Sequence, residues 1–220
     1  MHKKIFQKLG LVNTSFIILL LLCLLWFLIA HRNICLWLTW NMLLAWVTVI
    51  FVRAAVQSSR TWIFWVFIIL GILFLPNTFY IFTDLIHVNS FNFYQLHNHY
   101  SVIYTESLTP WIELFLVVAA AIFGWLLGLE SIKLIAKKFH RPILVPIVLS
   151  ILCGFGIWIG RFLRLNSWDI FRPNLIIEQV SQQANWFMLS FSLLFALVIF
   201  VSYLIFSQIS PLAKSSVRQK

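Results

Sequence analysis

Residues 61–87 read TWIFWVFIILGILFLPNTFYIFTDLIH, and no charged side chain occurs in this stretch before Asp84. An apolar run of this length is sufficient to cross a bilayer, because a spanning helix needs about 20 residues. The stretch therefore predicts a membrane helix over residues 61–83. It also raises the question of what Asp84 and His87 contact at its end.

The composition of the whole chain indicates the same environment. Of its 220 residues, 62% are hydrophobic and 10% are charged, and the mean hydropathy is +0.95. A soluble domain could not remove so much apolar surface from water. Backbone groups in lipid must satisfy one another, and the runs lack the alternation of a membrane barrel, so the spans must be helices.

We predict an all-α, polytopic six-helix transmembrane bundle that forms a single integral membrane domain over residues 1–220. Its cysteines, Cys23, Cys35 and Cys153, lie in apolar runs without CxxC spacing, which favours packing roles over ligation or a disulfide. The first run is too long for a signal peptide and has no small-x-small cleavage site. The predicted helices cover residues 11–30, 34–52, 61–83, 110–129, 142–160 and 186–206.

The distribution of charge predicts cytoplasmic N- and C-termini. With the N-terminus inside, all but four of the 16 Lys and Arg residues fall on the cytoplasmic side, as the positive-inside rule requires. All acidic residues except Glu130 then fall outside. The pI of about 10.0 is therefore a signal of topology rather than of nucleic-acid binding. The four outer basic residues are Arg32, Arg161, Arg164 and Arg172.

The third predicted helix carries a polar stripe at its outer end. Asn77, Tyr80, Asp84 and His87 are spaced by three, four and three residues, which keeps them on one helix face. Pro76 precedes the stripe and lacks an N–H group, so we expect a kink or break that frees the carbonyl of residue 72.

The fifth predicted helix ends on the same side, in GRFLRLNSWD, residues 160–169. Arg161 and Arg164 are flanked by tryptophans, an arrangement suited to stacking and to contacts with carboxylate or phosphate. Gly156 and Gly160 have the small-xxx-small spacing that allows another helix to approach closely. The two polar helix ends therefore meet in one leaflet.

The pairing of LPNTFYIFTDLIH (75–87) with GRFLRLNSWDI (160–170) resembles the bacterial membrane family known as domain of unknown function 1361. The resemblance covers residues 61–205. It implies a multi-pass protein of the bacterial plasma membrane and supplies no activity. It places eight residues on motif positions: Asn77, Tyr80, Asp84, His87, Arg161, Arg164, Asn166 and Asp169.

Three hypotheses follow for this outer polar group. In the first, an anionic lipid headgroup or an envelope-associated phosphate or carboxylate binds to Arg161, Arg164, Asn166, Asp169, Asn77 and Tyr80, while Asp84 and His87 are candidate catalytic groups for proton transfer. In the second, Asp84 forms a structural clamp with Arg161 and Arg164 in an assembly protein. The third is a transporter, although the inner halves of the helices hold few polar residues beyond Thr39, Asn41 and Thr48.

A metal site would draw on His97 and His99 in the polar segment 84–110, but their spacing matches no named metal motif, so none is predicted. No cofactor is predicted. The expected partners are membrane lipids, nucleic acid is excluded, and the sequence does not indicate an oligomeric state.

Overall fold

The computed structural model describes residues 2–98 and 101–209, with side chains for 13–95 and 101–208. Four spans are continuous: α1 (His2–Ala30), α2 (Ile34–Gln57), α5 (Thr109–Lys138) and α8 (Trp186–Ile209). The third span is composed of α3 (Thr61–Phe74), α4 (Pro76–Tyr80) and the 3-10 helix η1 (Ile81–Ser90). The fifth is composed of α6 (Leu144–Trp158) and the π-helix η2 (Ile159–Leu163).

All six spans are long and apolar enough to cross a membrane, so the predicted all-α six-helix transmembrane bundle is confirmed. Several predicted boundaries were wrong. The second, third and fourth spans continue to Gln57, Ser90 and Lys138, and the fifth begins at Leu144. Helices can continue beyond the apolar run because charged side chains at a helix end are accommodated at headgroup level.

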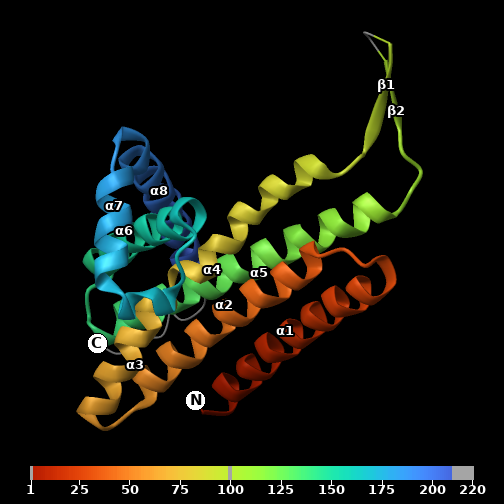
Figure 1. Ribbon diagram of the computed structural model, residues 1–220. Coiled ribbons are helices and arrows are strands. Elements are labelled where there is room, and N and C mark those ends of the chain that lie inside the picture. Colours follow the sequence, from red (N-terminus) through yellow and green to blue (C-terminus); the bar gives the residue numbers. More distant parts are fainter. Residues whose placement is uncertain (1, 99–100, 210–220) are drawn as a thin grey trace.

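The helices form two bodies, and the contacts between them come mainly from α4, which packs on α6, and from α5, which packs on α6 and α8. Figure 1 shows α1, α2 and α5 side by side, with α6, α7 (Pro173–Gln183) and α8 gathered as a second group. α2 packs on α3 and α5, whereas α6 packs mainly on α8. The short helix α4 contacts α2, α5 and α6. The segment around Pro76 therefore lies where the two bodies meet.

The break at Pro76 occurs as predicted, since α3 ends at Phe74 and α4 begins at Pro76. The expected free carbonyl of Ile72 was wrong, because the backbone N–H of Leu75 donates to it at 3.3 Å. The chain tightens by one residue ahead of the proline and satisfies that group locally. The carbonyls that accept hydrogen bonds from side chains are the next two along the chain, those of Leu73 and Phe74.

Side chains from α2, from α4 and from the 167–171 turn donate to those later carbonyls. The carbonyl of Phe74 accepts from Thr48 Oγ1 at 2.9 Å and from Asn77 Nδ2 at 3.0 Å. The carbonyl of Leu73 accepts from Ser167 Oγ at 3.4 Å. Because an unpaired carbonyl in lipid is costly, these contacts stabilise the break and attach it to α2 and to the 167–171 turn.

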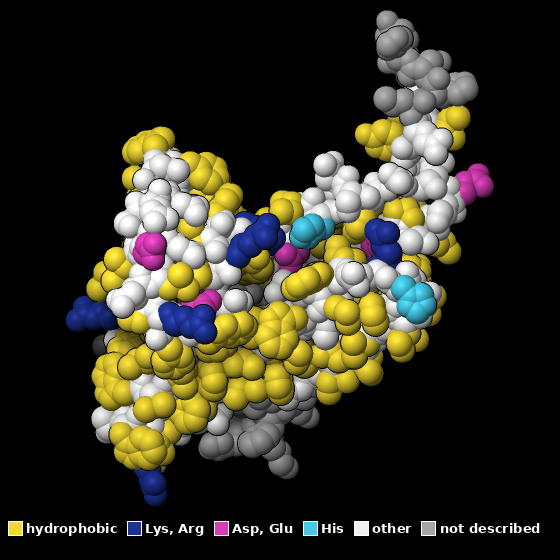
Figure 2. Space-filling view, in the orientation of Figure 1, with side chains coloured by type: hydrophobic (Ala, Val, Ile, Leu, Met, Phe, Trp, Pro, Cys, Tyr) yellow, Lys and Arg dark blue, Asp and Glu magenta, His cyan; other side chains and the backbone are white. Residues whose placement is uncertain are grey.

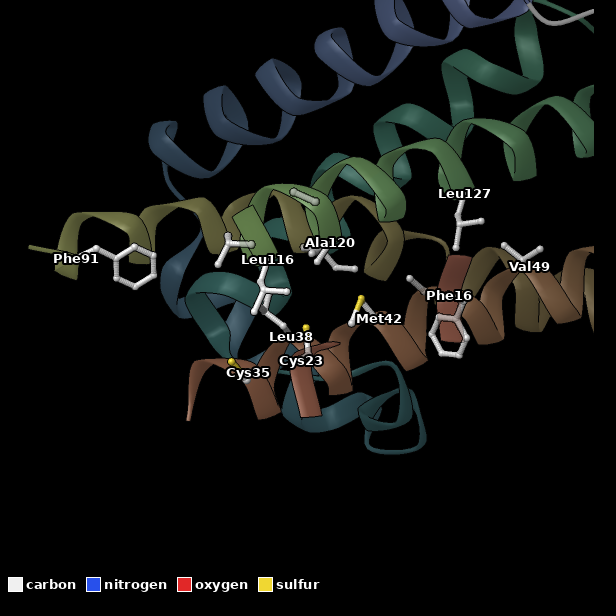
Figure 3. Close-up of a cluster of buried hydrophobic side chains, with 14 residues drawn as sticks. Phe16, Cys23, Cys35, Leu38, Met42, Val49, Phe91, Leu116, Ala120 and Leu127 are labelled. Atoms are coloured by element: carbon white, nitrogen blue, oxygen red, sulfur yellow. The ribbon is translucent and has the colours of Figure 1, made fainter. Parts of the chain in front are cut away.

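An apolar core lies between α1, α2 and α5 (Figure 3). Phe16 stacks on Trp46 with ring centroids 5.0 Å apart. Cys23 and Cys35 are buried in this core as free thiols, and Cys153 is buried in a second cluster that includes residues of α6 and α8.

Residues 91–98 and 101–108 do not continue the bundle. They include the strands β1 (Tyr94–Asn98) and β2 (Ser101–Tyr104), which pair as an antiparallel hairpin. Figure 1 shows the hairpin projecting away from the helices. The other additions are α7 and the 3-10 helix η3 (Ser167–Phe171), which follows the fifth span.

Candidate functional site

The predicted polar stripe of the third span lines a pocket between α2, the third span and α6. The pocket has a volume of about 970 Å³. Figure 2 shows charged and histidine side chains around a hollow, above a surface that is mostly hydrophobic. Its polar lining residues are Asn41, Asn77, Tyr80, Asp84, His87, Arg161, Arg164, Asn166 and Ser167.

Asp84 is the centre of the polar contacts. Its side chain is 7% exposed, and its Oδ1 lies 2.6 Å from Arg161 Nη2. Its Oδ2 accepts a hydrogen bond from Asn41 Nδ2 at 2.7 Å. A carboxylate at this position is costly unless it is paired, and here both oxygens have a donor. Three spans therefore meet at one carboxylate.

Arg161 is held on several sides. Its Nε donates to Thr83 Oγ1 at 2.9 Å, and its Nη2 also contacts that hydroxyl. The guanidinium carbon lies 4.4 Å from the centroid of the Tyr80 ring. A planar, delocalised cation can stack and donate in plane at the same time, which a lysine cannot do. Arg161 therefore fastens the fifth span to the third.

Close helix packing brings Arg161 to this position. A Cβ added to Gly156 would lie 2.6 Å from Pro76 Cγ, and one added to Gly160 would lie 3.1 Å from Tyr80 Cε2. Both distances are below normal carbon–carbon contact. The prediction that these glycines admit a neighbouring helix is confirmed, and the neighbour is α4.

Arg164 also lines the pocket, but its contacts differ from those of Arg161. It follows the π-turn η2 with φ 57, in the left-handed region that a residue with a Cβ rarely adopts. It is exposed, and no ion pair to it occurs among the side chains that the structure describes. The predicted clamp therefore involves Arg161 and not Arg164.

The NSWD turn, residues 166–169, contains both residues that stabilise the turn and residues that line the pocket. Asp169 Oδ2 accepts from the backbone N–H of Asn166 at 2.7 Å, and Asp169 is buried. Asn77 Nδ2 donates to Ser167 Oγ at 3.0 Å. Asn166 lines the pocket, whereas Asp169 is not among its lining residues. Asp169 therefore shapes the turn that presents Asn166.

His87 is exposed at the rim of the pocket. The hydrogen bonds of Asp84 go to Asn41 and Arg161, and none goes to His87 among the described side chains. The side chain of His97 and all of His99 lie outside the described residues. Within those residues, no cluster of three His, Cys, Asp or Glu side chains could hold a metal ion.

Three of the residues that complete the site were not predicted. Asn41 donates a hydrogen bond to Asp84, whereas the hydroxyls of Thr83 and Ser167 accept hydrogen bonds from Arg161 and Asn77. The assignment of Asn41 to the inner half of its helix was wrong, because Asn41 bonds to Asp84, which the same sequence analysis places at the outer end of the third span. A signal for a contact existed, because an amide within an apolar helix needs a partner. No pattern in the sequence indicates that its partner is Asp84 on another span.

A second ion pair joins α5 to the α1–α2 connection. Glu113 Oε1 lies 2.8 Å from Arg32 Nε, and the Glu113 side chain is 1% exposed. On a different part of the bundle, Arg53 Nη2 lies 2.9 Å from Glu130 Oε1. Each pair joins two residues that the charge analysis assigns to the same side of the membrane.

The fold and the site together define a multi-pass membrane protein with a partly charged pocket at one end of a six-helix bundle. The chain belongs to the family described as "Protein of unknown function (DUF1361)", whose model matches residues 40–202. No curated protein and no solved structure matches the chain.

Proposed function

We propose that the protein binds an anionic group at the polar end of this pocket, either the headgroup of a lipid or a free envelope-associated phosphate or carboxylate. The observation that carries the proposal is Arg164, an exposed cation without an ion-pair partner among the described side chains, on a pocket that also holds an amide and a histidine. A guanidinium of this kind suits bidentate binding of phosphate or carboxylate.

The charges around the pocket favour an anion. Arg161 Nη2 lies 2.6 Å from Asp84 Oδ1 and balances the charge of that carboxylate. The positive charge of Arg164 therefore has no ion-pair partner among the described side chains. Asn166 and His87 line the same pocket and can act as hydrogen-bond donors. The left-handed backbone at Arg164 is costly, and such strain is commonly found where a side chain must be presented to a ligand.

The clamp hypothesis and the binding hypothesis apply to different residues. The contacts of Arg161 with Asp84, Thr83 and Tyr80 support a structural role. None of these contacts involves Arg164. A purely structural protein would therefore tolerate the loss of Arg164, whereas a binding protein would not. Asp84 and His87 remain candidate proton-transfer groups to which no reaction is assigned.

The proposed location is the plasma membrane of a bacterium, with both termini in the cytoplasm and the pocket in the outer leaflet. The excess of Lys and Arg in the segments predicted to be inside supports this orientation. The pocket would then face molecules of the cell envelope.

The test compares Arg164→Gln with Arg172→Gln in purified protein, using phosphatidylglycerol and glycerol phosphate as probes. Arg172 is a matched control, because it is exposed near the same end and does not line the pocket. Loss of a charge-assisted contact of about 1.5–3 kcal/mol predicts that Arg164→Gln binds its probe roughly 10- to 100-fold more weakly. Wild-type affinity in Arg164→Gln would contradict the proposal.

A further inference from the structure

The pocket continues inward from its polar end as an apolar groove. Its deeper walls are Leu44 of α2, Ile72 and Leu73 of α3, and Leu152 and Phe155 of α6. A small hydrophilic anion would leave these walls unused, and water would find few polar partners there. The lining therefore indicates a ligand with a polar end and a long apolar part.

The length of the groove fits one leaflet of a bilayer. At 1.5 Å per residue, Ile72 and Tyr80 are about 12 Å apart along their span, and Leu152 and Arg161 are about 13.5 Å apart. Half of the hydrocarbon core is about 15 Å thick. The groove therefore runs from the level of the charged side chains almost to the middle of the membrane.

The α6 wall of the groove is partly exposed, since Leu152 is 46% exposed. In the part of the chain that the structure describes, α6 makes no extensive contact with α2 or α3 and reaches the first body through α4 and α5. Near the polar end, Trp40 of α2 meets Trp168 of η3 with ring centroids 6.1 Å apart. Tryptophans are typical of the headgroup level, so this contact marks the headgroup end of the groove. A hydrocarbon chain deeper in the bilayer than this contact would pass directly between the groove and the leaflet.

We infer that the ligand of Arg164 is a membrane lipid with an anionic headgroup, which enters sideways from the leaflet. The headgroup binds Arg164 and Asn166, and one hydrocarbon chain lies in the groove between α3 and α6. Charge complementarity at the polar end and the apolar walls below it both favour this occupant. The inference rests on the proposed function and specifies the class of its ligand.

The test blocks the groove and leaves the charges in place. Leu152→Trp fills the groove, and Ile151→Trp is its matched control, because the two side chains are neighbours on α6 with exposures of 46% and 48%, and only Leu152 lines the pocket. Binding of fluorescent phosphatidylglycerol is measured in neutral detergent. Overpacking of this kind predicts about tenfold weaker binding in Leu152→Trp and wild-type binding in Ile151→Trp.

Competition separates the possible ligands. We expect unlabelled phosphatidylglycerol to displace the probe, and glycerol phosphate and phosphatidylcholine with the same chains to fail. Displacement by glycerol phosphate, or unchanged binding in Leu152→Trp, would overturn the lipid inference and leave anion binding intact. Equal displacement by phosphatidylcholine would show a general lipid contact and would also overturn it. Unchanged binding in Arg164→Gln would instead reject the proposed function.

A measurement on the wild-type protein avoids any effect of tryptophan on folding. Phosphatidylglycerol with a photoactivatable group near the end of one chain is cross-linked to the protein, and the labelled peptides are identified. We expect label on α3 and α6 near Ile72 and Leu152. Label confined to the outward faces of α1 and α8 would overturn the inference.

Discussion

At the residue scale, Asp84 and Arg161 depend on each other more than on any ligand. Their side chains are 7% and 17% exposed, and Asn41 donates to the second oxygen of the carboxylate. If a ligand displaced Arg161 from Asp84, it would leave a largely buried carboxylate without its cation. Binding at the pocket should therefore use donors that Asp84 does not require, and Arg164 is such a donor.

Asp84→Asn tests this pair. The substitution leaves Arg161 without its counter-ion, and breaking a buried pair costs 3–5 kcal/mol, so we expect a loss of about 2–3 kcal/mol for this partly buried one. The measurement is unfolding of purified protein in detergent. Glu178→Gln is the control, because Glu178 is exposed and forms no ion pair among the described side chains, and its effect should be within about 0.5 kcal/mol.

The double variant Asp84→Asn/Arg161→Gln identifies the cause of that loss. If the cost comes from the uncompensated charge, the double variant should be less destabilised than the sum of the two single variants. Additive effects would show that the two residues contribute independently, and that the 2.6 Å contact does not clamp the third span to the fifth.

At the scale of the elements, the break at Pro76 determines how the third span meets its neighbours. The carbonyl of Phe74 receives donors from α2 and α4, and the carbonyl of Leu73 receives one from the 167–171 turn. Carbonyls left without a partner in lipid would be costly. Here side-chain donors pair with them, and these hydrogen bonds attach α2, α4 and η3 to the break.

Thr48→Val tests the attachment to α2. The substitution removes the hydroxyl that donates to Phe74 and nearly conserves the shape of the buried side chain. We expect a loss of about 1 kcal/mol, the net value of a hydrogen bond. Thr39→Val is the control on the same helix, because its hydroxyl donates only within α2, to Cys35. Equal losses in both variants would contradict a special role for the break.

Much of the site at this scale could be predicted, because it depends on helix periodicity. The spacing of Asn77, Tyr80, Asp84 and His87 places them on one stripe, and the structure puts all four on one pocket. The rest depends on contacts between spans. The π-turn at Ile159–Leu163 separates Arg164 from the clamp, and it has no local signal because tertiary packing decides where a helix widens.

At the scale of the whole molecule, the number and order of the spans could be predicted from apolar runs alone, because the bilayer sets their length. The division into two bodies could not be. It arises because α6 packs mainly on α8, while α4 and α5 join this pair to the rest of the bundle. The same division leaves the groove open between α3 and α6, so the shape of the pocket follows from packing between spans.

The orientation in the membrane is the last prediction, and exposed serines in two connections test it. Ser107 precedes α5, and Ser59 lies between α2 and α3 beside Arg60. If the positive-inside rule holds, a cysteine at Ser107 should react with an impermeant maleimide in intact cells. A cysteine at Ser59 should react only after the cells are permeabilised. Cys23, Cys35 and Cys153 are buried and should give little background.

Ser131 would be a poor choice for the inner position, because it is 1% exposed on α5 and would stay unlabelled in either orientation. With Ser59 and Ser107, the two orientations give opposite results. Labelling of Ser59→Cys and protection of Ser107→Cys would reverse the topology and move the pocket to the cytoplasmic leaflet. The ligand would then have to be an anionic lipid of that leaflet, whereas the geometry of Arg164 and the groove would be unchanged.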